Sequence, residues 1–163
     1  MADQLILTTV PTVEVGMGIQ SPPHEAFEAF ADPDITTRFW FTKSSGRLEP
    51  GAEVRWGWEP FDAEAMVRVR AVEQDRRILL DWGDGGDDMR TLELLFVPWQ
   101  GDGTYVRATE TGQQGTGDEV AAHAAESTGG FTMVLCSLKA LLEHDVALTA
   151  VLDRAPADAD LPD

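Results

Sequence analysis

The stretch FTMVLCSLKALL, residues 131–142, contributes most to the choice of fold. Phe131, Leu135, Leu138 and Leu142 recur every three or four residues, which is the spacing of one face of an α-helix. The pattern predicts one long helix near the C-terminal end, whose apolar stripe could extend through residues 146–152. Such a stripe needs an apolar surface to cover it.

The residues on either side of this helix have a different composition. Residues 112–128 are rich in Gly, Gln, Thr, Ala and acidic residues, and this predicts a flexible or partly helical approach to the helix. After Ala155 the chain is acidic and has too little apolar surface to order itself. We therefore expect a single domain over residues 10–153 and a disordered acidic tail over residues 154–163.

The surface that the helix covers is predicted by residues 44–111. These residues form a meander of alternating strands, with turn residues at 49–51, 82–88 and 100–103. One face carries charged side chains, and the other collects apolar ones, as in an antiparallel sheet with one solvated side. The predicted inward residues are Val54, Trp56, Trp58, Ala65, Val67, Val69, Ile78, Leu80, Trp82, Leu92, Leu94, Phe96, Val106 and Ala108.

The N-terminal part completes the order of elements. Residues 12–19 alternate as a first strand, and Ser21 followed by Pro22 predicts the cap and first position of a short helix. The pair Asp32-Pro33 ends that helix and starts a second one through residues 36–40. The predicted fold class is therefore α+β: a curved antiparallel sheet of about six or seven strands, with two short helices after strand one and a long C-terminal helix.

Composition and charge exclude several classes of function. The chain has 12 basic and 29 acidic residues, and a net charge of −17 repels phosphate backbones and anionic membrane surfaces. We therefore expect neither nucleic acid nor membrane as a partner. Because Cys136 is the only cysteine, no intrachain disulfide can form, which favours a reducing compartment. No apolar run approaches the roughly 18 residues that span a bilayer, and the expected location is cytoplasmic.

No metal or cofactor site is expected from the sequence. His24, His123 and His144 lie far apart, and none has a Cys or His partner at metal-ligand spacing. The glycines at 83, 85 and 86 lack the lysine and the following helix of a phosphate-binding loop. A hairpin turn is the better interpretation of that stretch.

Several short stretches together resemble a known family. They are SPPHEAFEAF (21–30), DP (32–33), RFW (38–40), LEPGA (48–52), VRATETG (106–112) and GGF (129–131). Their order resembles bacterial proteins related to the C-terminal domain of the Hsp90 ATPase activator Aha1. That family belongs to the START-like, or polyketide cyclase/Bet v 1-like (SRPBCC), superfamily.

The resemblance covers roughly residues 10–145. It implies a helix-grip fold, in which the sheet wraps around the C-terminal helix, opened by GGF, and leaves a hydrophobic cavity between them. Phe131 stands where many relatives place Trp, and the approach over residues 112–128 is long and Gly-rich. The mouth of the cavity is therefore expected to differ from theirs.

The candidate site residues are the inward aromatic side chains and one carboxylate. The tryptophans either wall a ligand site or fill the core. Glu110 alternates inward, so it is either enclosed with a donor, where it could act as an acid or base, or solvated at the strand end. The predicted ligand-binding residues are Trp40, Trp56, Trp58, Val69, Leu80, Trp82, Leu94, Phe96, Ala108, Glu110, Phe131, Leu135 and Leu138.

Three functions stay open at this point. The first is binding of a small apolar or aromatic molecule, favoured because no catalytic set of residues stands out. The second is a cyclase- or aromatase-type enzyme in which Glu110, Trp58 and Tyr105 steer proton transfer. The third is a homodimeric or chaperone-linked interaction module, which requires an exposed apolar patch. No catalytic residue is assigned.

Overall fold

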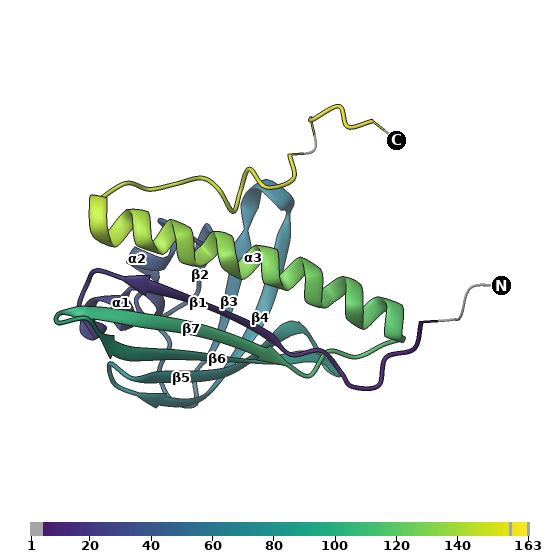
Figure 1. Ribbon diagram of the computed structural model, residues 1–163, viewed down its shortest axis with the longest axis horizontal. Coiled ribbons are helices and arrows are strands. Elements are labelled where there is room, and N and C mark those ends of the chain that lie inside the picture. Colours follow the sequence, from purple (N-terminus) through teal and green to yellow (C-terminus); the bar gives the residue numbers. More distant parts are fainter. Residues whose placement is uncertain (1–4, 157, 163) are drawn as a thin grey trace.

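The computed structural model describes residues 5–156 and 158–162. It contains one antiparallel sheet with the strand order β1-β7-β6-β5-β4-β3-β2, and α3 lies across it (Figure 1). The predicted α+β helix-grip fold is confirmed. The strands are β1 (Val13–Ile19), β2 (Lys43–Ser44), β3 (Glu53–Trp58), β4 (Ala63–Glu73), β5 (Arg77–Gly85), β6 (Asp88–Trp99) and β7 (Gly103–Thr111). The helices are α1 (Pro23–Ala31), α2 (Pro33–Thr36), the 3₁₀ turn η1 (Glu59–Phe61) and α3 (Gly117–His144).

The inward face of the sheet is the one that alternation predicts. Val67, Ile78, Leu80, Leu92 and the other predicted inward residues are buried, and the two exceptions, Trp58 and Trp82, are half-buried. A side-chain period of two places every second residue of a strand on the same face, so one correct assignment fixes the rest of a regular strand. Trp58 and Trp82 are therefore the two inward residues of the sheet that are only half-buried.

The helix start that the resemblance implied, at Gly129, is wrong, and the partly helical interpretation of residues 112–128 is confirmed. α3 begins at Gly117, because Thr116 and Glu119 form a capping box in which each side chain accepts a hydrogen bond from the other residue's backbone N–H. Residues 117–128 are therefore the first turns of the helix, and Gly129 and Gly130 lie inside it.

The prediction that the apolar stripe of the helix continues through residues 146–152 is also wrong, because these residues are not helical. Asp145 adopts a left-handed conformation with φ of 53° and ends α3. The following segment runs back along the outer side of α3 (Figure 1). Among the described residues, every helix is too short or too polar to cross a lipid bilayer.

The two short helices are shifted from their predicted positions. Pro22, rather than Ser21, is the N-cap residue of α1, and the buried Ser21 hydroxyl donates to the carboxylate of Glu25 instead. The second helix covers Pro33–Thr36 and stops before residue 40. Asp32 caps it by accepting from the backbone N–H of Asp34 at 3.0 Å.

Candidate functional site

A cavity of about 460 Å³ lies between the sheet, α3 and the C-terminal segment. Its walls come from parts of the chain that are far apart in sequence: the segment after α2, the β3–β4 hairpin, β5, β6, α3 and residues 151–155. In Figure 1 the β3–β4 hairpin rises behind α3, and its residues Trp58, Phe61 and Ala63 line the cavity. The lining residues are Trp40, Trp58, Phe61, Ala63, Trp82, Arg90, His123, Glu126, Ser127, Gly130, Phe131, Met133, Val134, Val151, Arg154 and Ala155.

One wall of the cavity is aromatic. The Trp82 ring lies 5.8 Å from that of Trp40, 6.4 Å from that of Trp58 and 6.0 Å from that of Phe131, measured between centroids. Edge-to-face and tilted contacts at these distances are favourable and hold the rings in fixed orientations. Trp56 is 1% exposed and packs behind this wall, so it fills the core.

The other wall is polar and is organised by Glu110, whose side chain has no exposed surface. Its Oε2 accepts from Trp82 Nε1 at 2.9 Å and from Arg90 Nε at 3.4 Å. Its Oε1 accepts from Ser127 Oγ at 2.8 Å and lies 2.9 Å from His123 Nε2. The solvated interpretation of Glu110 is therefore wrong, because four donors that all line the cavity converge on a carboxylate buried behind them.

This geometry fixes the roles of His123 and Ser127. We assign the Nε2 proton of His123 from the hydrogen-bond network, since the neighbouring carboxylate only accepts. Ser127 Oγ is 3.1 Å from the same nitrogen and donates to Glu110 instead. In this arrangement Ser127 donates to the carboxylate rather than to His123, and the second ring nitrogen of His123, Nδ1, makes no hydrogen bond within the described residues.

Arg90 and His123 separate this cavity from a second one of about 210 Å³. The Arg90 guanidinium carbon lies 5.3 Å from the centroid of Trp82, as in a cation–π contact. The second cavity is bordered by Asp87, Asp88 and Glu119, among others. In the described part of the chain, no group of three His, Cys, Asp or Glu side chains converges as metal ligands do.

The C-terminal segment closes the cavity through Arg154. Arg154 Nη1 donates to the backbone carbonyl of Glu126 at 3.0 Å, and Nη2 lies 3.5 Å from the Glu126 carboxylate. A Cβ atom at Gly129 would lie 2.7 Å from this guanidinium, and one at Gly130 would lie 3.1 Å from it. The glycine pair weakens α3 by about 1 kcal/mol per residue, and Arg154 occupies the space that it leaves.

The structure brings together only part of the predicted site. Trp40, Trp58, Trp82 and Phe131 line the cavity, and Glu110 lies directly behind the wall. The remaining predicted residues are buried in the core beneath: Trp56, Val69, Leu80, Leu94, Phe96, Ala108, Leu135 and Leu138. Ligand binding by any of these residues stays a prediction, as does the domain boundary at residue 153.

The sequence did not predict the polar wall of the cavity, nor the lining residues from the β3–β4 turn and from residues 151–155. His123 and Ser127 are four residues apart, which places them on one face of a helix, but the sequence alone does not show that this face points to Glu110. Arg90 lies two residues before Leu92 in β6, so alternation places its side chain on the same inward face as those of Leu92 and Leu94. The other missed residues are Phe61, Ala63, Glu126, Gly130, Met133, Val134, Val151, Arg154 and Ala155.

Comparison with known proteins gives a family and a fold. Residues 20–143 match the family model described as Activator of Hsp90 ATPase homolog 1-like protein. A protein from Staphylococcus saprophyticus has 29% sequence identity and a TM-score of 0.73, over 85% of this chain and 96% of that one. No curated protein matches the chain.

Two more distant structures share the fold. The Aha1 protein of Colwellia psychrerythraea, solved in solution as a dimer, has 18% identity and a TM-score of 0.71 over 82% of this chain and 97% of that one. DynU16, a protein in the dynemicin biosynthetic locus, has 21% identity and a TM-score of 0.71 over 83% of this chain and 48% of that one.

Proposed function

The chain belongs to the family of Activator of Hsp90 ATPase homolog 1-like proteins, and we propose that it binds a small apolar or aromatic molecule in the cavity between its sheet and α3. The main evidence for this function is the incomplete burial of two tryptophans. Of all the predicted inward residues of the sheet, only Trp58 and Trp82 are half-buried rather than buried, and both line the cavity. An aromatic ligand would cover more of their surface.

The size and lining of the cavity support this function. A volume of about 460 Å³ lies within the usual range of roughly 300–1,000 Å³ for small-molecule sites. The lining is mostly apolar, with a few polar groups converging from one side, which is the composition typical of such sites. DynU16, which shares the fold, is a protein in the dynemicin biosynthetic locus, and this supports a role for the fold in biosynthesis.

A second candidate function, a cyclase- or aromatase-type enzyme, is favoured by one observation. His123 lies on the cavity wall with Nε2 held by a buried carboxylate, so Nδ1 could take a proton from a bound substrate or return it. Tyr105, one of the three residues predicted for that reaction, lies on the outer face of the sheet and is 39% exposed. The other two remain candidates, because Trp58 lines the cavity and Glu110 lies behind its wall, and His123 is added to them.

Binding can be tested with N-phenyl-1-naphthylamine, an uncharged aromatic probe whose emission rises in apolar surroundings. We expect saturable binding to the wild-type protein. Ala63→Phe places a ring in the mouth of the cavity and is expected to weaken binding at least tenfold. The matched control is Glu64→Phe, because Glu64 is the next residue of β4 and pairs with Arg55 on the opposite face of the sheet.

Two outcomes would contradict the proposed function. One is that the probe does not bind the wild-type protein at all. The other is that Ala63→Phe and Glu64→Phe bind it equally well. Native mass spectrometry of the purified protein complements the titration, since a copurified compound would identify the ligand class.

A further inference from the structure

We propose that the molecule bound in this cavity is an aromatic compound that carries an acidic group, such as a carboxylate, sulfonate or phenolate, and that Arg90 binds this group. The inference rests on the proposed function of the cavity and adds the charge of the ligand to it.

Arg90 has more donors than partners. A guanidinium carries five N–H groups, and within the described residues its only hydrogen bond runs from Nε to Glu110 at 3.4 Å. The nearest other carboxylate contact is Asp88 Oδ1, which lies 4.0 Å from Nη1 and is too distant for a hydrogen bond. The Arg90 side chain is 21% exposed. Its Nη groups therefore make no hydrogen bond within the described residues, and Arg90 lines both cavities.

An acidic group supplies the missing acceptors. A carboxylate or sulfonate can accept two parallel hydrogen bonds from a guanidinium, and such charge-assisted bonds are stronger than neutral ones. The guanidinium also lies over the face of Trp82. A ligand ring that packs against the aromatic wall would therefore bring an attached acidic group within reach of Arg90.

The charges on the two sides of Arg90 decide which side the acidic group occupies. The second cavity is bordered by Asp87, Asp88 and Glu119, which would repel an anion. On the aromatic side, Glu126 is paired with Arg154, and the negative charge of Glu110 behind the wall is shared by four donors. The aromatic cavity is the side that accepts a negative charge.

The net charge of −17 acts against anion binding, but at longer range. At physiological ionic strength the screening length is about 8 Å, so carboxylates on the outer surface are largely screened at the cavity. Arg90 would contact the ligand directly, in surroundings of low dielectric constant where charge pairs are stronger. The local contact is therefore expected to outweigh the surface charge.

The test compares two probes that differ in one group. 1-Anilinonaphthalene-8-sulfonate and N-phenyl-1-naphthylamine share a ring system, and only the first carries a negative charge. We expect the wild-type protein to bind the sulfonate at least tenfold more tightly. Arg90→Met is expected to abolish this preference, so that the variant binds the two probes with equal affinity. Arg68→Met is the control for overall charge, because Arg68 pairs with Glu53 on the outer face of the sheet.

Arg90→Met leaves the buried carboxylate of Glu110 with one donor fewer, and this could destabilise the protein. A second variant controls for that effect. Arg90→Met combined with Glu110→Gln removes both charges together and is expected to lose the preference as well. Equal affinities of the wild-type protein for the two probes would overturn the inference and leave the proposed function intact. A sulfonate preference that persists in a folded Arg90 variant would also overturn it. If neither probe binds the wild-type protein, both the inference and the proposed function fail.

Discussion

Trp82 donates its indole N–H to the buried carboxylate of Glu110 at 2.9 Å, and this bond joins the aromatic wall of the cavity to the polar one. The sheet register explains the pairing. Trp82 on β5 lies opposite Arg90 on β6, and Leu92, two residues further along β6, lies opposite Glu110 on β7. All four side chains therefore point to the same face, and the orientation of the Trp82 ring depends on Glu110.

Replacing Glu110 by Ala is expected to destabilise the protein by about 3–5 kcal/mol, since it leaves Arg90 and three other donors without their common acceptor. Urea denaturation of the purified variant measures this effect. Glu53→Ala is the control, because Glu53 is 67% exposed and its pair with Arg68 is expected to contribute less than about 1 kcal/mol. Equal stabilities of the two variants would show that the buried network is not a significant contribution.

The contact between Gly129 and Arg154 predicts a coupling between α3 and the C-terminal segment. Gly129→Ala should strengthen the helix by about 1 kcal/mol, but its Cβ would lie 2.7 Å from the Arg154 guanidinium and displace it. We expect the full gain only when Arg154 is also replaced by Ala. A double-mutant cycle by urea denaturation is expected to give a coupling above about 0.5 kcal/mol. Additive effects would contradict the contact.

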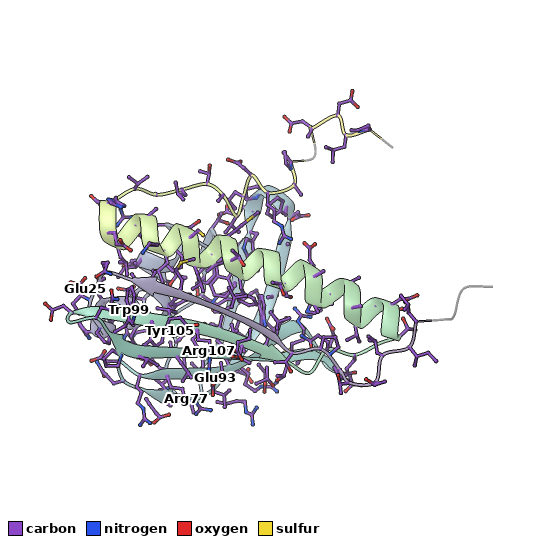
Figure 2. All side chains as sticks on the ribbon, in the orientation of Figure 1. Glu25, Arg77, Glu93, Trp99, Tyr105 and Arg107 are labelled. Atoms are coloured by element: carbon purple, nitrogen blue, oxygen red, sulfur yellow. The ribbon has the colours of Figure 1, made fainter. Side chains whose placement is uncertain are left out.

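A second close approach lies on the outer face of the sheet. The Trp99 ring at the end of β6 packs on Gly18 of β1, and Tyr105 on β7 packs on Gly16 in the same way; Figure 2 labels both aromatic side chains. A Cβ at Gly18 would lie 2.7 Å from the Trp99 ring. Gly18→Ala is therefore expected to destabilise the protein by about 1–3 kcal/mol.

Thermal unfolding checks this prediction against Gly46→Ala. A Cβ at Gly46 meets only Val54, at an ordinary contact distance of 3.8 Å, so no destabilisation is expected there. If the space at Gly18 were free, Gly18→Ala would instead stabilise the strand by about 0.5–1 kcal/mol. The sign of the change therefore decides whether Trp99 packs on β1.

The sequence predicts the sheet and the aromatic wall much better than the polar wall. Alternation locates Trp58, Trp82 and Glu110 because a strand has only two faces. The capping box at Thr116 and Glu119 is visible in the sequence, but the start of α3 is still not predicted there. The reason is that the glycine pair interrupts the helical pattern and the first turns carry few large apolar residues.

Two parts of the site depend on long-range pairing. The position of Arg90 beside Glu110 follows from the register of β6 with β7, which a single sequence does not reveal. Arg154 follows an irregular segment with no periodicity, so nothing in the sequence predicts that it returns to α3. The charged side of the site therefore emerges only from the folded structure.

One ion pair gives the stability a predictable pH dependence. Arg47 donates two hydrogen bonds of 2.7 Å to Glu28, and these bonds lower the pKa of Glu28. A carboxylate with a lowered pKa stabilises the fold above its ordinary pKa of about 4.3, and this contribution is lost as the pH falls through the lowered value. Arg47→Met is expected to reduce stability at pH 7 by at most about 1 kcal/mol, since the pair is partly exposed.

Urea denaturation between pH 7 and pH 2.5 follows the difference between wild type and Arg47→Met. The difference is expected to shrink as the pH falls below about 4. Arg76→Met, which removes an exposed pair with Glu73, is expected to show little difference at any pH. A difference for Arg47→Met that stays constant over this range would contradict the assignment to the charge on Glu28.

A crystal structure of the protein with 1-anilinonaphthalene-8-sulfonate tests the central claim most directly. We expect the naphthalene ring to lie between Trp58, Trp82 and α3, with the sulfonate within hydrogen-bond distance of Arg90. An empty cavity with the probe bound on the outer face of the sheet would contradict ligand binding under α3. A filled cavity with the sulfonate turned away from Arg90 would contradict the predicted charge of the ligand alone.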